Sequence, residues 1–182
     1  MNNQRLWALA PLMVLCLAGC GRDADKAGPD GVAAPSNQTL SAAIADEGDL
    51  DMLEGVVRNG GLSEVLEGKG PYTVFAPVNA ALGTAGSELA GEAMKAQSAA
   101  LLRAHIVPGA LTRADIEAAL ARGGADGVQM RTMSDGLLTF SKDGEAVVVT
   151  AADGATARLT GAETVVTNGV VQPVDGVLVK AG

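Results

Sequence analysis

Residues 72–82 read Tyr72-Thr73-Val74-Phe75-Ala76-Pro77-Val78-Asn79-Ala80-Ala81-Leu82. The part from Tyr72 to Ala76 has the composition of a β-strand. Pro77 ends this strand, because proline cannot donate a hydrogen bond to a neighbouring strand. We therefore expect a short strand here, within a region whose other segments have the spacing of helices.

Apolar residues on both sides of this strand recur at helical spacing. Before it, the expected helices centre on Leu40 and Ile44, on Leu50 to Val57, and on Leu62 to Leu66. Asp49 is placed to cap the second of them. After the strand, one helix is expected from about Glu92 to Ala104, with Met94, Leu101 and Leu102 facing inward. Another begins at the capping box Thr112-Arg113-Ala114-Asp115 and ends at Gly123-Gly124.

Beyond Gly127 the period of the apolar residues changes to two, which is typical of strands. The expected strands are Val128–Met133, Leu137–Phe140, Ala146–Thr150, Ala157–Leu159, Thr164–Thr167, Val170–Val174 and Val177–Val179. Asn-Gly and Asp-Gly dipeptides separate many of them, and these dipeptides are favoured in tight hairpin turns. Helices segregated from a largely antiparallel sheet indicate an α+β domain.

Three segments resemble the signatures of the fasciclin domain family, in family order and at family-like spacing. They are residues 72–82, then Leu102-Arg103-Ala104-His105-Ile106-Val107-Pro108-Gly109, and then Asn168-Gly169-Val170-Val171-Gln172-Pro173-Val174-Asp175-Gly176-Val177-Leu178. The resemblance implies a wedge of mainly antiparallel β-strands packed with several short helices, in a domain over residues 37–180. It implies a structural role for the motif residues Thr73, Phe75, Pro77, Asn79, His105, Pro108, Gly109, Asn168, Gly169 and Asp175.

The chain departs from the family pattern at four positions. Ala104 replaces the tyrosine of a Tyr-His pair that some animal relatives use in integrin adhesion, so we do not transfer that role. Gln172 replaces the closing histidine, and Val78 replaces a threonine. Pro173 follows Gln172, and proline within a strand predicts an edge position or a bulge there.

His105 is the only histidine in the chain. Its apolar neighbours predict a buried, neutral imidazole that is hydrogen-bonded to the backbone and has a pKa below 6.5. The alternative, a ligand or general base, lacks a second His or Cys for a metal site and a nucleophile elbow for a triad. The acidic residues from Asp46 to Glu54 lack the pattern of a calcium loop and predict a solvated helix start. We therefore expect no catalytic, cofactor-binding or metal-binding residues.

The N-terminus has the layout of a secretory signal peptide over residues 1–19. Arg5 precedes an apolar run from Leu6 to Leu17, and Leu17-Ala18-Gly19-Cys20 is similar to the lipobox of bacterial lipoproteins. The lipobox implies cleavage before Cys20 and acylation of Cys20 with diacylglycerol and a fatty acid such as palmitate. The alternative is an ordinary secretory signal, whereas the run is too short for a transmembrane span. Gly21, in place of aspartate, favours sorting to the outer membrane.

Residues 20–36 are rich in Gly, Ala, Asp and Pro and predict a flexible linker. The full chain of 182 residues carries 13 basic and 21 acidic side chains, a formal net charge of −8. This charge disfavours nucleic acid as a partner. The sequence therefore predicts a non-catalytic, lipid-anchored binding or adhesion protein of the bacterial cell envelope, whose partner is an envelope protein or an extracellular matrix polymer. The alternative is a periplasmic carrier or accessory protein that holds a small apolar ligand.

Overall fold

A computed structural model of the chain describes residues 36–123 and 127–180. The predicted signal peptide, Cys20 and all of the predicted linker except Ser36 lie outside the described residues. The helices are α1 (Leu40–Asp46), α2 (Asp51–Gly60), α3 (Ser63–Glu67), α4 (Asn79–Leu89), α5 (Lys95–His105) and α6 (Arg113–Gly123), with 3-10 turns η1 (Gly48–Leu50) and η2 (Glu92–Met94). The strands are β1 (Tyr72–Pro77), β2 (Ile106–Pro108), β3 (Val128–Arg131), β4 (Leu137–Asp143), β5 (Ala146–Ala151), β6 (Thr156–Arg158), β7 (Thr164–Val166) and β8 (Gly169–Val174).

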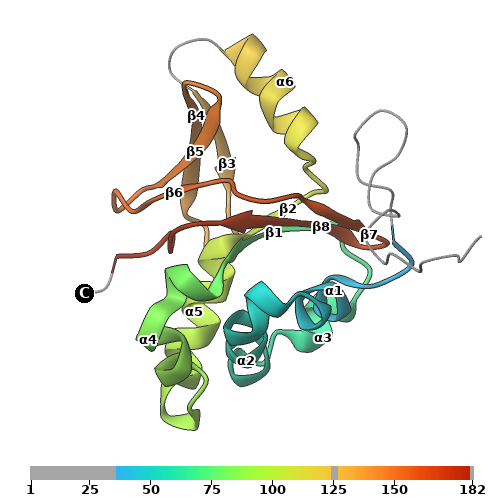
Figure 1. The fold of residues 1–182 in the computed structure, drawn as a ribbon, viewed down its shortest axis with the longest axis vertical. Coiled ribbons are helices and arrows are strands. Elements are labelled where there is room, and N and C mark those ends of the chain that lie inside the picture. The colour runs from blue at the N-terminus through green and yellow to red at the C-terminus, as the bar shows by residue number, and fades with distance from the viewer. Residues whose placement is uncertain (1–35, 124–126, 181–182) are drawn as a thin grey trace, which may run out of the picture.

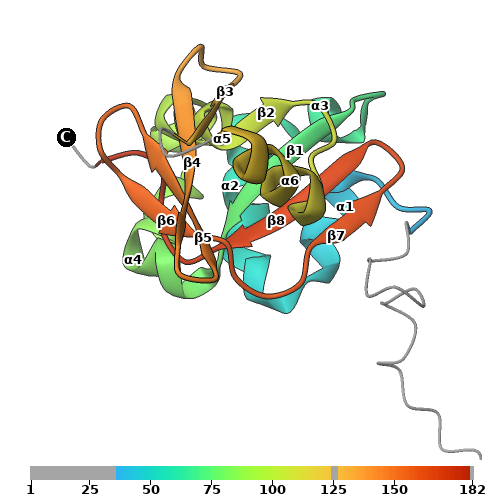
Figure 2. The ribbon, with the colours of Figure 1, turned by 90° about the horizontal axis from the view of Figure 1, so that it is seen from above.

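The strands form two four-stranded sheets. Sheet A has the order β2-β1-β8-β7, and β1 and β8 pair in parallel. Sheet B is the antiparallel meander β3-β4-β5-β6. Sheet A lies in the middle of the molecule, with α1 to α5 on one face and sheet B and α6 on the other (Figures 1 and 2). The fold is therefore α+β with mostly antiparallel sheets, as the sequence predicts.

Strand β1 is buried on both of its faces, so its side chains enter two different cores. Val74 and Ala76 join the apolar cluster between sheet A and the helices α1 to α5. Phe75 points the other way, into the cluster formed with sheet B and α6, where its ring lies 5.3 Å from the ring of Phe140. This alternation follows from the period of two along a strand, and it explains why the segment is almost continuously apolar.

The expectation that Pro173 lies in an edge strand or at a bulge is wrong. Strand β8 is an interior strand of sheet A, and Pro173 pairs in register with Ala76 of β1. Proline is accommodated because the ladder with β7 has ended by then, at the pair Thr164 and Val171. Beyond that pair the backbone N–H of Thr160 donates to the Pro173 carbonyl.

Two further expectations differ from the structure. Residues Val177–Val179 form no strand and continue from β8 as an irregular C-terminal strap, residues 175–180. Helix α4 was not expected at all, because its sequence is rich in Gly, Ala and Ser and Gly83 inside it has non-helical angles (φ 52°, ψ −140°). Both segments lie at the same end of the molecule, beside α5 (Figure 1).

The predicted capping box at the start of α6 is confirmed. The Asp115 carboxylate accepts from the Thr112 backbone N–H at 3.0 Å, and the Thr112 hydroxyl accepts from the Asp115 N–H at 3.1 Å. The hydroxyl of Thr112 also donates to the same carboxylate. These bonds to Thr112, from its hydroxyl and then its backbone, hold the pKa of Asp115 below its usual range.

Candidate functional site

The buried Thr73 of the first motif connects β1 to the loop after β2. Its hydroxyl donates to the Gly109 carbonyl at 2.7 Å and accepts from the Leu111 N–H at 2.8 Å. Gly109, which has φ +111°, turns the chain back at this point, and the preceding Pro108 pairs in register with Tyr72. Both hydrogen-bonding capacities of the hydroxyl are therefore used inside the fold.

Asn79 caps a helix that is distant from it in the sequence. Its side-chain carbonyl accepts from the backbone N–H of Met52 at 3.0 Å, and its amide donates to the Gly48 carbonyl at 2.9 Å. The expected cap Asp49 makes no capping bond, and Leu50 occupies the N-cap position of α2. The N-terminal N–H groups of a helix need an acceptor, and here the acceptor comes from the residue that follows β1 and Val78.

Asn168 and Gly169 join β8 to the N-terminal helices. The Asn168 side chain accepts from the Leu40 N–H at 2.8 Å and donates to the carbonyls of Leu66 and Gly68 at 2.8 and 2.7 Å. Gly169 lies so close to β1 that a Cβ atom there would stand 1.9 Å from the Tyr72 carbonyl oxygen. Only glycine fits this close approach. The fold therefore requires both residues, Asn168 for its hydrogen bonds and Gly169 for its lack of a side chain.

Two further motif residues, Asp175 and Pro77, lie at the other end of β8. The Asp175 carboxylate accepts from the Arg158 N–H at 2.6 Å, which ties the end of β8 to β6. Pro77 is buried at the end of β1, in register with Val174. We call Thr73, Asn79, His105, Asn168 and Asp175, with the backbone groups that they bind, the braced seam.

His105 is fully buried at the C-terminus of α5. Its Nδ1 lies 2.8 Å from the Leu101 carbonyl, and its Nε2 accepts from the Leu178 N–H at 2.9 Å. This pair of partners requires the neutral tautomer with the proton on Nδ1. Burial lowers the pKa of His105 to about 4, against a smaller opposing effect of the Leu101 carbonyl. The imidazole thus holds the C-terminal strap against α5 and presents no free nitrogen for chemistry.

Gln172, which replaces the closing histidine of the family pattern, lies in a second polar cluster. Gln172 is fully buried and donates to the Glu163 carboxylate at 2.5 Å and to the Leu111 carbonyl at 3.1 Å. Glu163 also accepts from the Arg113 N–H at 2.6 Å, at the start of α6. A hollow of about 300 Å³ beside it is bordered by Glu163, Glu47 and Asp49. Within residues 36–123 and 127–180, no three His, Cys, Asp or Glu side chains converge as metal ligands.

A larger concave surface lies between α4, α5 and the C-terminal strap, and we call it the α4–α5 groove. It has a volume of about 640 Å³. The lining side chains are mostly apolar: Ala81, Leu82, Ala85, Leu89, Met94, Ala100, Leu101, Ala104, Val177 and Val179, with Glu88, Gln97 and Lys180 as the polar ones. Met94 and Leu101, which were expected to face inward, are only half-buried because they border this groove.

Sequence reasoning missed the groove because it missed α4. The helical pattern of α4 is weak, since its apolar residues are mainly alanines and three of its eleven residues are Gly or Ser. No local signal marks it, because the non-helical Gly83 separates Ala81 from Ala85, the two alanines of α4 that border the groove. In the described part of the chain, no helix has both the length and the apolar content that a membrane span needs.

Comparison with known proteins agrees with this architecture. The family model of the fasciclin domain matches residues 48–180. "Protein sll1483" of Synechocystis sp. (strain ATCC 27184 / PCC 6803 / Kazusa) is 30% identical over 152 residues, which cover 80% of this chain and 76% of that protein.

Among solved structures, a FAS1 domain pair from the insect cell adhesion molecule Fasciclin I is similar in fold. Its TM-score is 0.68 at 15% sequence identity, over 80% of this chain. The match spans about half of that chain (52%), which contains two such domains. The family match, which extends from the 3-10 turn before α2 to the C-terminal strap, and the shared fold lead to one conclusion: the chain belongs to the fasciclin domain family.

Proposed function

We propose that this chain is a non-catalytic binding or adhesion protein of the bacterial cell envelope, held to the membrane by lipid on Cys20. The observation that carries the proposal is how the motif residues are used. The buried side chains Thr73, His105 and Asn168 of the braced seam are engaged with backbone groups, so they are not available as nucleophiles or general bases. Binding through the surface of a rigid domain remains, and the similar insect domain pair comes from a cell adhesion molecule.

The lipid anchor rests on Leu17-Ala18-Gly19-Cys20. Diacylglycerol supplies two acyl chains, which is the number that stable anchoring takes. A tether of this kind places the domain in the periplasm or on the cell surface, with the outer membrane as the expected membrane. There the domain meets an envelope protein or a matrix polymer.

The proposal is tested by replacing Cys20 with Ser in the full chain. We expect the variant to lose lipid labelling and to leave the membrane fraction. The released protein then serves as bait for envelope extracts, and a specific partner is expected to be retained by it. A wild-type mature protein that still contains Trp7, measured by mass spectrometry, would contradict the anchor.

A carrier for a small apolar ligand is a second candidate, and the α4–α5 groove favours it. Ligand pockets have volumes of about 300–1,000 Å³ and are lined mostly by apolar side chains with a few polar groups. The groove meets both conditions. Extraction of the protein purified from envelopes with organic solvent is expected to release an apolar compound that an Ala100→Phe variant does not retain.

A further inference from the structure

We infer that Asn168-Gly169 is a latent modification site: the fold prevents its deamidation, and deamidation in the unfolded chain prevents the chain from folding again. The chain contains two Asn-Gly dipeptides, Asn59-Gly60 and Asn168-Gly169. Asparagine followed by glycine deamidates readily, because glycine has no side chain to hinder the attack of its own backbone nitrogen. The inference is independent of both functions proposed above.

The reaction requires a rearrangement at one peptide. The Gly169 backbone nitrogen, once it has lost its proton, attacks the side-chain carbonyl carbon of Asn168. A C–N bond forms, the side-chain amide nitrogen leaves as ammonia, and a succinimide ring remains. Water then opens the ring at either of its two carbonyls, which gives aspartate or isoaspartate at position 168. The Asn168 side chain must therefore turn toward the Gly169 nitrogen, and water must reach the site.

In the fold, three hydrogen bonds to distant segments fix the Asn168 side chain. Its oxygen accepts from the Leu40 N–H at 2.8 Å, and its nitrogen donates to the carbonyls of Leu66 and Gly68 at 2.8 and 2.7 Å. One backbone donor and two backbone acceptors also determine which side-chain atom is the oxygen and which is the nitrogen. Asn168 is only 5% exposed. A rotation toward Gly169 would leave all three backbone groups without these partners.

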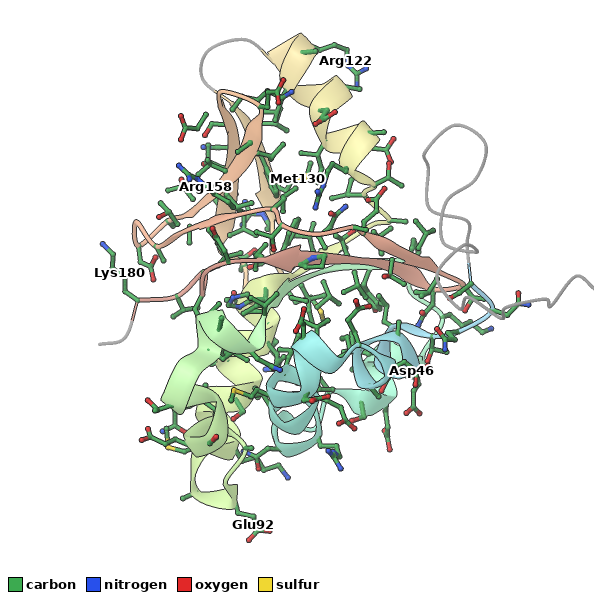
Figure 3. All side chains as sticks on the ribbon, viewed as in Figure 1. Asp46, Glu92, Arg122, Met130, Arg158 and Lys180 are labelled. Carbon is green, nitrogen blue, oxygen red and sulfur yellow. The ribbon has the colours of Figure 1, made fainter. Side chains whose placement is uncertain are left out.

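The peptide that carries the attacking nitrogen is fixed as well. Gly169 is in register with Tyr72 of β1 on one side and with Val166 of β7 on the other. The Asn168 carbonyl, in the same peptide unit as the Gly169 nitrogen, accepts from the Tyr72 N–H at 3.1 Å. Side chains occupy the space between sheet A and α1 to α3, the side on which Asn168 forms its bonds (Figure 3). The fold therefore opposes both the rotation and the access of water.

Deamidation removes a donor that the braced seam needs. Aspartate at position 168 puts a carboxylate oxygen against the carbonyl oxygens of Leu66 and Gly68, where the amide N–H groups stand in the native protein. Buried acceptors that lose their donor destabilise a fold. Isoaspartate adds a carbon atom to the main chain and thereby disturbs the register of β8 with its neighbours. A chain that has reacted while unfolded cannot rebuild the seam, so its unfolding becomes irreversible.

The second dipeptide is protected in a similar way but less completely. The Asn59 amide donates to the carbonyls of Leu89 and Gly91 at 2.6 and 2.8 Å, and Gly60 is the last residue of α2. Asn59 is only partly buried, so a carboxylate at this position keeps contact with water. We therefore expect deamidation at Asn168, and not at Asn59, to decide whether the chain refolds.

The first test compares the native and the unfolded full chain in detergent. Samples without urea and in urea above the unfolding midpoint are kept at mildly alkaline pH, and peptide mapping by mass spectrometry follows Asn168. We expect deamidation to be at least about 100-fold slower in the native protein, because only opened molecules react. Asn79, which alanine follows, is the internal control and is expected to react far more slowly than Asn168 in urea. Equal rates at Asn168 in both samples, or no reaction in urea, would overturn the inference.

A second measurement links the modification to refolding. Samples are diluted out of urea after increasing times, and size-exclusion chromatography separates the refolded molecules from the others. We expect deamidated Asn168 only in the pool that fails to refold, whereas deamidated Asn59 is expected in both pools. The same share of deamidated Asn168 in both pools would overturn the inference. So would an Asn168→Asp variant that folds with the melting temperature of the wild type.

Discussion

The braced seam and the α4–α5 groove use their residues in opposite ways. In the seam, polar side chains, three of them buried, bind backbone groups of distant segments, as Asn168 does with Leu40, Leu66 and Gly68. In the groove, alanines, valine and leucine border an open space and make few polar contacts. The polar motif residues make the seam, whereas the motif segments contribute only the apolar side chains Ala81, Leu82, Ala104 and Val177 to the groove. The comparison teaches that the polar motif residues build the fold, and that the binding properties particular to this chain are to be sought at surfaces outside those polar residues.

Removing the largest side chain of the seam region is expected to have the greatest effect. Phe75 is fully buried and contacts Phe140, and Phe75→Ala is expected to cost about 3–5 kcal/mol of unfolding free energy. Such a loss is a large part of a typical total of about 5–15 kcal/mol. Thermal unfolding measures it, with the exposed Leu137→Ala as the control. An unchanged melting temperature would contradict the central position of β1.

The pH dependence of the unfolding free energy tests whether His105 of the seam is a buried structural residue. Burial lowers its folded-state pKa to about 4, from 6.5. Folding therefore favours the neutral imidazole, and the contribution of this preference to the unfolding free energy is fully present above pH 6.5. It is lost as the pH falls from 6.5 toward 4, because the unfolded state takes up the proton first. The difference corresponds to about 3 kcal/mol.

Urea unfolding at a series of pH values measures this effect. His105→Ala has lost the titrating group and serves as the control, so its stability is expected to vary less across the same window. The imidazole pKa itself is accessible by NMR titration. A value above 6.5 in the folded protein would contradict the buried, neutral state and would make His105 a candidate functional residue again.

A smaller loss of unfolding free energy is expected when one hydrogen-bonding side chain of the seam is replaced by an apolar side chain of the same shape. Thr73→Val keeps the volume but leaves the Gly109 carbonyl and the Leu111 N–H without their partner. Unsatisfied buried groups cost about 1–3 kcal/mol. Chemical denaturation measures this loss, and Thr139→Val on the outer face of sheet B is the matched control. A loss equal to that of the control would show that the Gly109 carbonyl and the Leu111 N–H do not need the Thr73 hydroxyl.

The smallest effect on stability is expected in the groove. Ala100 is exposed on α5, so Ala100→Phe is expected to change the unfolding free energy by only about 0.5 kcal/mol, through helix propensity. On the opposite side of α5, the contact with α2 is tight, and a Cβ on Gly60 would stand 2.9 Å from Leu102. Gly60→Ala is therefore expected to destabilise more. Equal effects, measured by thermal unfolding, would remove the distinction between the two sides.

Local sequence was sufficient for much of the fold. The change of period near Gly127, the capping box of Thr112 and Asp115, and the strand at Tyr72 each depend on neighbours within a few residues, and the structure has all three. The burial of His105 also follows from the apolar residues next to it. Such patterns are predictable because the interactions that they describe are made within one turn or one strand.

Long-range contacts decided the rest. Helix α2 is capped by Asn79, 27 residues away, and the strap is held by His105, 73 residues from Leu178. Helix α4 has little amphipathic pattern of its own, and it lies against α2, α5 and β1. The groove exists only because α4, α5 and the strap meet, so no single segment encodes it. A helix of marginal propensity takes its stability from packing, and that packing is defined only in the folded chain.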